Sequence, residues 1–264
     1  MLIVNFSRET HADAYTCTPH IQDAYKTWHT NFAKYPISLV RRTKKCWDSL
    51  RSWASTNYPQ LARSLTPGVS ESFLDHIETT LGWELPLSVR LLYRFCGGQD
   101  YEAIDDDDDM HDDDKRTYAG LLGGYKFYDH NVDVKFLSLE MVVYLTKNTI
   151  PHLKRLKAQN WIIIAASGPL MKFFLLNCRD GSLHVATRKC ASHGEVINCV
   201  PPHPDSTTMQ DSLLRWLEEY SRRLNSGMYK AQKNGGAIRI SLFPDQEPWC
   251  TEAVSQGVQV SDEF

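Results

Sequence analysis

Residues 68–99, GVSESFLDHIETTLGWELPLSVRLLYRFCGGQ, predict two short helices with well-marked ends. Ser70 is a favourable N-cap for the first helix, and Gly82 falls just past its last apolar residue. Pro86 suits the first turn of the second helix, and Gly97-Gly98 ends it. The expected buried stripe of the first helix is Phe73, Leu74, Ile77 and Leu81, and the second helix carries Val89, Leu92, Tyr93 and Phe95.

The residues before this stretch predict a pair of longer helices. Apolar side chains recur at three- and four-residue steps from Ile21 to Tyr35, which places them on one helical face. Pro36 ends that helix, and a second helix follows with apolar positions Ile37, Val40, Trp47, Leu50, Trp53 and Ala54. Pro59 and Pro67-Gly68 then predict turns.

The residues after this stretch predict strands. Tyr118–Tyr128 is aromatic and contains glycine, which favours a strand with a bend. Ser138 could cap a helix that continues through Leu145. The further predicted strands are Trp161–Ala166, Lys172–Cys178, Leu183–Thr187 and Val196–Val200. Asp180-Gly181 between two of them is a strong hairpin signal.

An amphipathic helix follows, with Met209, Leu213, Trp216, Leu217, Tyr220 and Leu224 on its apolar face. The remaining tail is polar, apart from Ile238–Phe243, whose alternation suits an edge strand. Helices, then several antiparallel strands, then a helix define an α+β fold: mainly antiparallel sheet packed with helices, preceded by a helical pair.

The composition is that of an ordinary globular protein. Of 264 residues, 42% are hydrophobic and 23% are charged, which excludes a wholly disordered chain, a collagen and a coiled coil. The longest apolar run, Trp161–Ala166, is far shorter than the ~20 residues that span a bilayer. The first residues lack the basic and apolar regions of a secretory signal. We therefore expect an intracellular protein, cytoplasmic or nuclear, with no membrane partner.

Acidic charge is concentrated in one tract. Asp105–Asp114 contains eight Asp and no Lys or Arg, whereas the whole chain has a formal net charge of −3, so the rest of the chain is mildly basic. The tract lacks the central Gly and final Glu of a calcium-binding EF-hand loop. Eight mutually repelling carboxylates favour a solvated loop, and contact with a basic partner is the alternative.

The chain lacks the common catalytic motifs: no nucleophile elbow, phosphate-binding loop, dinucleotide fingerprint or zinc-protease helix is present. Ser167 follows an apolar strand, but no glycine precedes it and Pro169 would block the helix of an elbow, so a hairpin serine is favoured. An enzyme with an unrecognised hydrolytic site, which uses Ser167 or a histidine such as His184 or His193, remains the less favoured alternative.

No metal or other cofactor is expected. Cys190, His193 and Cys199 form a cluster, with Cys178 and His203 nearby, but no Cys-x2-4-Cys knuckle is present. Seven scattered cysteines favour free thiols in a reducing compartment.

A basic group lies beside Trp47. Arg41, Arg42, Lys44 and Lys45 could follow a nucleic-acid backbone, but a solvated helix face is the favoured interpretation. We therefore expect no nucleic-acid partner.

Paired residues in the opening stretch resemble the start of the SUKH (Smi/Knr-like) domain: Leu81-Gly82, Leu85-Pro86, Leu92-Tyr93 and Gly98-Gln99. Residues 24–36 and 40–53 resemble the linker between F-box and SUKH domain in plant Skp-interacting F-box proteins. Residues 214–227 resemble the closing helix of these proteins. Ile240–Phe243 followed by Ala253–Val260 resembles the junction into an ApaG-type β-sandwich. The resemblance covers about residues 20–260.

This resemblance implies three regions: an N-terminal helical linker (1–59), a SUKH domain (60–226) with an acidic loop (102–116), and a tail with the truncated start of an ApaG-like domain (227–264). It implies a non-enzymatic protein-interaction module, the substrate-recognition region of an F-box subunit in a Skp–cullin–F-box ubiquitin ligase. No F-box is recognisable before Ala24, so the Skp adaptor is expected as a partner only with an F-box upstream. A truncated product without independent function is a further alternative.

The family also implies a binding face. If that face is present here, Gln99, Tyr101 and Tyr125 would lie near it and contact a protein partner. An alternative for Gln99 is a hydrogen bond that caps the end of the preceding helix.

Overall fold

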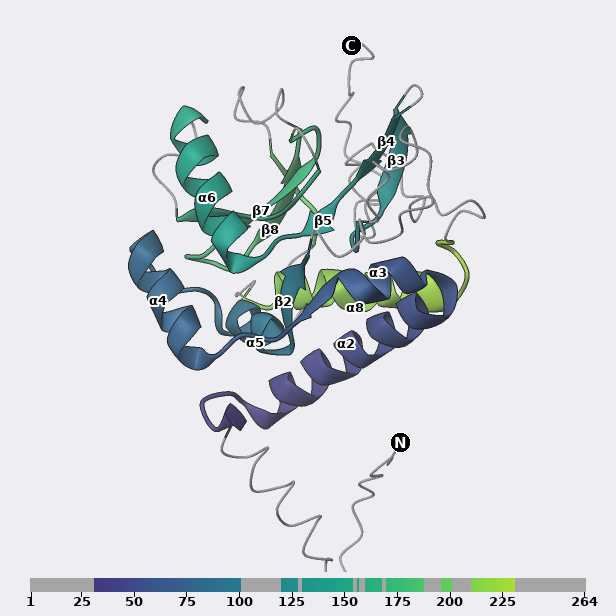
Figure 1. Cartoon of the computed structure of the whole chain (residues 1–264). Coiled ribbons are helices and arrows are strands. Elements are labelled where there is room, and N and C mark those ends of the chain that lie inside the picture. Colours follow the sequence, from purple (N-terminus) through teal and green to yellow (C-terminus); the bar gives the residue numbers. More distant parts are fainter. Residues whose placement is uncertain are drawn as a thin grey trace, which may run out of the picture. The chain divides into compact units, whose positions relative to one another are not determined.

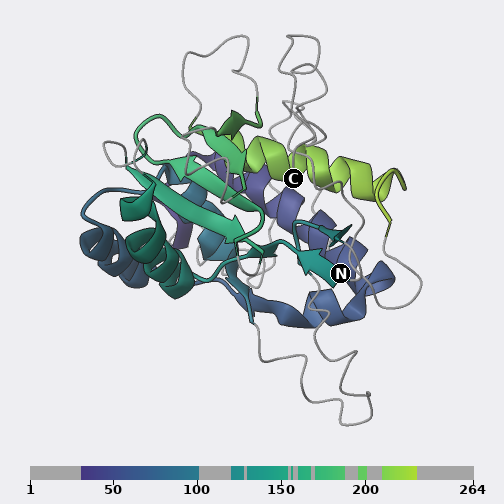
Figure 2. The same ribbon diagram turned by 90° about the horizontal axis from the view of Figure 1, so that it is seen from above.

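The computed structural model describes residues 31–100, 120–127, 130–153, 156, 160–167, 170–187, 196–200 and 210–230. The helices and strands named below belong to one compact unit, which begins at Ile37. They combine a helical layer with antiparallel strands, which confirms the predicted α+β class (Figures 1 and 2).

The helical layer contains α2 (Ile37–Asn57), α3 (Pro59–Ser64), α5 (Leu87–Phe95) and α8 (Ser212–Asn225). Helix α2 packs against α3, α5 and α8, and Figure 2 shows α2 and α8 side by side. Trp47 of α2 and Trp216 of α8 are fully buried, as their spacing predicts. Ile37 differs from the other apolar positions of α2, because it is exposed at the start of the helix.

The caps of the two short helices follow the prediction closely. Ser70 Oγ accepts a hydrogen bond from the Phe73 N–H (3.1 Å) at the start of α4 (Glu71–Leu81). Gly82 ends α4 in the left-handed conformation (φ 87°). Pro86 occupies the N-cap of α5, immediately before the first turn in which it was predicted.

The main sheet has five antiparallel strands in the order β5-β6-β7-β8-β9. These strands are β5 (Lys135–Phe136), β6 (Trp161–Ala166), β7 (Phe173–Asn177), β8 (Leu183–Ala186) and β9 (Ile197–Asn198). The turn between β7 and β8 contains Gly181 in the left-handed region (φ 76°), as the Asp-Gly pair predicts. The four predicted strands from Trp161 to Val200 are therefore confirmed: β6 has the predicted bounds, and the other three are shorter than predicted.

Two small sheets complete the described strands: β1 (Leu65–Pro67) with β2 (Cys96–Gln99), and β3 (Gly124–Phe127) with β4 (His130–Asp133). Strand β2 was not predicted, because Gly97-Gly98 usually stops a helix without starting a strand. The glycines allow a close approach instead: a Cβ on Gly97 would lie 2.6 Å from the Pro67 carbonyl oxygen. Strand β3 lies within the predicted segment Tyr118–Tyr128.

Helix α6 (Leu139–Thr149) begins at Ser138, as predicted, and continues into the short helix η1 (Ile150–His152). The hydroxyl of Thr146 accepts a hydrogen bond from the Ile163 N–H (3.1 Å). Strand β5 pairs only with the last two residues of β6, so α6 satisfies part of the edge that β5 leaves open.

Other predicted elements fall outside the part of the chain that the structure describes. These are most of the helix Ile21–Tyr35, the acidic tract Asp105–Asp114 and the strand Ile238–Phe243. The region boundaries at residues 59/60 and 226/227 remain predictions.

Candidate functional site

Tyr93 and Gly98, from the predicted pairs Leu92-Tyr93 and Gly98-Gln99, converge on the segment that joins β5 to α6. The Tyr93 hydroxyl donates to the Leu137 carbonyl oxygen (2.9 Å), and its ring stacks on Phe136 (centroids 5.0 Å apart). Gly98 has φ +119°, and a Cβ there would lie 2.6 Å from the Ser138 nitrogen. Only glycine fits this conformation at this distance.

Gln99 links three segments through its side-chain amide. Nε2 donates to the Ser64 hydroxyl (3.0 Å), and Oε1 accepts from the backbone N–H groups of Leu121 (2.8 Å) and Phe136 (3.0 Å). The side chain is 2% exposed. Its amide therefore acts as a peptide group of a neighbouring strand would, and it connects β2 to β5 of the main sheet. Figure 1 shows β2 close to β5.

We call this set the Gln99 junction: Ser64, Tyr93, Gly98, Gln99, Leu121 and Phe136. It holds the chain on both sides of residues 101–119. On one side, the Asp100 N–H donates to the Ser64 carbonyl oxygen (2.7 Å); on the other, Leu121 donates to Gln99. The two points that flank the acidic tract in sequence are thus fixed to the same network.

The structure places the three predicted partner-binding residues differently. Gln99 is buried in the junction, where its bonds go to other parts of the fold. Tyr125 lies on β3, opposite Val132 of β4. Tyr101 lies outside the described residues. Contact between these residues and a protein partner remains a prediction.

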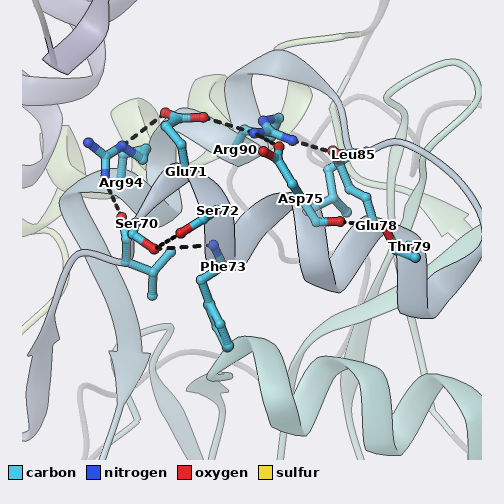
Figure 3. Close-up of polar contacts among 11 residues, drawn as sticks. Ser70, Glu71, Ser72, Phe73, Asp75, Glu78, Thr79, Leu85, Arg90 and Arg94 are labelled. Atoms are coloured by element: carbon cyan, nitrogen blue, oxygen red, sulfur yellow. Dashed lines mark hydrogen bonds and ion pairs between the residues drawn. The ribbon is translucent and has the colours of Figure 1, made fainter.

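A network of ion pairs fixes α4 against α5 (Figure 3). The Arg90 guanidinium pairs with Glu71 (2.8 Å), Asp75 (2.7 Å) and Glu78, and Arg94 pairs with Glu71 (3.0 Å). Arg90 is only 9% exposed, so these bonds are less screened than surface pairs. The network orients α5, the helix that carries Tyr93 into the Gln99 junction.

A buried acid–base pair at the start of β5 was missed by sequence reasoning. Asp133 and Lys135 are 9% and 7% exposed. Burial raises the pKa of Asp133 to about 7, against the opposing effects of Lys135 and of a hydrogen bond from the Gly120 N–H. Burial lowers the pKa of Lys135 to about 8, against the opposing charge of Asp133. Alternating charged and apolar residues usually indicate one solvated strand face, so the pattern carried no signal of burial.

Ser167 lies at the hairpin between β6 and β7, where its hydroxyl donates to the Lys172 carbonyl oxygen (3.1 Å) and accepts from the Lys172 N–H (2.9 Å). His184 lies on β8, two strands away from β6, at a separation of about 10 Å or more. The structure therefore does not bring Ser167 and His184 together. His193 lies outside the described residues.

His184 instead contacts the β7–β8 turn. Its Nε2 lies 3.0 Å from the Ser182 hydroxyl, which donates to Asp180 Oδ1 at 2.6 Å. Since the single hydroxyl proton is directed to the carboxylate, the histidine is the donor to Ser182 and cannot also act as its base. Burial lowers the pKa of His184 to about 4.

The other candidate groups have structural partners. Arg42 of α2 bonds Glu218 of α8 (3.0 and 2.7 Å) and Asp211, the N-cap of α8 (2.9 Å). These bonds link α2 to α8. Cys199 donates to the Leu183 carbonyl oxygen (3.3 Å), whereas Cys190 and His203 lie outside the described residues.

Within the described ranges, no three His, Cys, Asp or Glu side chains gather in a metal-binding group, and no helix is long and apolar enough to cross a membrane.

The fold is α+β, and comparison with known proteins identifies relatives of this chain. The chain is homologous to "F-box protein SKIP16" from Arabidopsis thaliana, with 35% identity over 251 residues, 92% of this chain and 55% of that protein. It is also similar to "F-box only protein 3" from Rattus norvegicus (30% over 94 residues) and from Homo sapiens (31% over 87 residues). These shorter matches cover 36% and 33% of this chain, and 16% and 15% of those proteins. The chain spans about half the length of its Arabidopsis relative. No family model matches.

Proposed function

We propose that this chain is the substrate-recognition region of an F-box subunit of a Skp–cullin–F-box ubiquitin ligase, and that it acts by binding proteins without catalysing a reaction itself. The observation that carries the proposal is the alignment with an F-box protein over 92% of the chain. In this proposal, residues 60–226 form the SUKH domain, and residues 227–264 lead into an ApaG-like domain.

The Gln99 junction supports this proposal through its position. It fixes the chain on both sides of residues 101–119, the segment that contains Tyr101 and the acidic tract. In our proposal this segment and Tyr125 form the partner-binding face. Gln99 is a positioning residue, because it holds Leu121 at the end of the segment. A tract with eight aspartates in ten residues favours a partner with a basic surface.

Binding of the Skp adaptor requires an F-box in this proposal, so the test joins the chain to an F-box from another protein. The fusion is assembled with the Skp adaptor, the cullin and the remaining ligase components. Proteins captured from plant extract are then assayed for ubiquitination. We expect at least one captured protein to be ubiquitinated by the fusion, and Tyr101→Ala and Tyr125→Ala to reduce both its capture and its modification.

Tyr144→Ala is the matched control, because Tyr144 is 61% exposed on α6, away from the proposed face in sequence. Equal loss with the Tyr144 variant would remove the case for the proposed face. Equal capture by the heat-unfolded chain, or modification that does not need the fusion, would overturn the recognition role. The chain is also mixed with the Skp adaptor alone; binding there would show that the F-box requirement is wrong.

A further inference from the structure

Two oppositely charged side chains lie buried together where β4 joins β5. Asp133 ends β4 and Lys135 begins β5, with 9% and 7% of their surfaces exposed. Because they are two residues apart in an extended segment, they share one face. Phe136 lies on the opposite face, in the core between Trp47 and Tyr93.

The turn Gly120–Gly123 packs directly on this segment. The Leu122 N–H donates to the Val134 carbonyl oxygen (3.0 Å), and the Val134 N–H donates to the Gly123 carbonyl oxygen (2.7 Å). A Cβ on Gly120 would lie 2.3 Å from the Val134 oxygen, so the backbones are in close contact. The Gly120 N–H also acts on the Asp133 carboxyl group, since it lowers the pKa of that group. The turn is therefore bonded to Val134, the residue between Asp133 and Lys135.

The Asp133 carboxyl group is incompletely satisfied in this closed arrangement. Its Oδ1 is buried and has no hydrogen-bond partner among the residues that the structure describes. Within the described part, the ionisable groups that act on it are Lys135 of β5 and the buried hydroxyl of Tyr58, between α2 and α3. A buried carboxylate with an open acceptor is unfavourable. Two events relieve it: a proton removes the charge, or opening of the turn admits water.

We propose that Asp133 is a proton-controlled latch for the turn Gly120–Gly123. The turn stays closed when the carboxyl group is protonated, and it opens more often when that group is ionised. The neighbouring clamp, Gln99, is neutral and holds Leu121 regardless of pH. Gly120, at one end of the turn, is thus held by the ionisable Asp133, and the next residue, Leu121, is held by the neutral Gln99.

The sign of the effect follows from linkage. The pKa of Asp133 is about 7 with the turn closed, whereas exposure to water would return it toward its ordinary value near 4. The closed state therefore binds the proton more tightly, and acid favours closure. Lys135 acts in the opposite direction: its pKa is about 8 in the closed state, so loss of its proton at higher pH also favours closure. Opening is greatest between about pH 7 and 8.

Amide hydrogen exchange by NMR tests the latch in the full chain. The probes are the N–H groups of Leu122 and Val134, and the reference is the Val142 N–H, which donates to the carbonyl oxygen of Ser138, the N-cap of α6. After correction for intrinsic exchange, we expect the opening constant of the probes to rise up to about tenfold per pH unit between pH 5 and 7. Asp133→Asn should abolish this rise, and Val142 should not show it.

A carbon-13 titration of the wild-type Asp133 carboxyl group gives an answer that needs no variant. Titration below pH 5 would overturn the proposal. So would an unchanged rise in Asp133→Asn, or an equal rise at Val142, since the latter reports global opening. If Asp133→Asn does not fold, the double variant Asp133→Asn/Lys135→Met replaces it, because this variant removes both buried charges. A rise of the opening constant with pH that persists in the double variant would also overturn the proposal.

Discussion

The side-chain oxygen of Gln99 accepts a hydrogen bond from the backbone N–H of Leu121 across 2.8 Å, and in the sequence these two residues flank the segment that contains the acidic tract. The same oxygen accepts from Phe136, so one amide oxygen joins three separate segments. A motif residue expected to meet a partner is thus part of the fold's interior.

Replacing Gln99 by Leu should destabilise the protein by about 2–4 kcal/mol. The change keeps the volume but leaves the N–H groups of Leu121 and Phe136 buried without their acceptor. Urea unfolding followed by circular dichroism measures the loss. Asn148→Leu is the control. Asn148 is exposed, and its amide nitrogen donates to the Tyr144 carbonyl oxygen of the same helix. Equal effects of the two substitutions would show that the junction has no special importance.

Gly98→Ala should be more damaging than Gly82→Ala. Both glycines have positive φ, but a Cβ on Gly98 would meet the Ser138 backbone at 2.6 Å, whereas a Cβ on Gly82 would meet nothing within 4 Å. Gly82→Ala should therefore cost about 1 kcal/mol of backbone strain, and Gly98→Ala about 3 kcal/mol or more. Thermal unfolding of the two variants measures the difference. A smaller loss for Gly98→Ala would contradict the close approach.

Arg90→Met should destabilise the protein far more than Arg42→Met. Arg90 pairs with Glu71, Asp75 and Glu78 and is almost buried, so its removal leaves carboxylates without their cation and should cost about 3 kcal/mol. The Arg42 side chain is 42% exposed, and solvent screening limits its loss to about 1 kcal/mol. Denaturant midpoints of the two variants measure this contrast; equal midpoints would contradict it.

Asp133 and His184 should have opposite effects on stability between about pH 4 and 6.5. The folded-state pKa of Asp133 is raised, so its contribution is present in acid and falls as the pH rises. The folded-state pKa of His184 is lowered to about 4, so its contribution is lost as the pH falls below its unfolded value near 6.5. Each effect is at most about 1.4 kcal/mol per pH unit, and the two largely cancel in the wild type.

Single variants should separate these two effects. Relative to wild type, Asp133→Asn should gain stability as the pH rises from 4 to 6.5, whereas His184→Phe should lose it. Free energies of unfolding measured at several pH values give both slopes. Parallel curves for wild type and either variant would mean that the substituted residue does not titrate differently on folding.

Local patterns in the sequence predicted the elements whose stability is local. Ser70, Gly82 and Ser138 mark helix ends through hydrogen bonds and φ values that depend on nearby residues, and the structure shows them there. The Asp-Gly hairpin was found for the same reason. Strand β2 was missed because its stability depends on β1, about 30 residues away in sequence, and on glycines that resemble a stop signal.

The candidate site shows the same division. The motif residues Tyr93, Gly98 and Gln99 could be selected from the sequence, but the segment they contact, Phe136–Ser138, could not, because it is distant in the chain. Burial of Asp133 and Lys135 was also not predictable. Their burial depends on the turn Gly120–Gly123, whose position is a product of the tertiary fold.

The junction also bears on how this protein can change during evolution. Ser64 accepts a hydrogen bond from Asp100 and Gln99 accepts one from Leu121, so both ends of the chain between Asp100 and Leu121 are fixed. Doubling the length of a flexible connection raises its closure entropy by only about 0.6 kcal/mol. Insertions between these anchors therefore leave the folded core almost unaffected. Selection can lengthen or shorten this stretch, or change its charge, while the residues of the Gln99 junction stay the same.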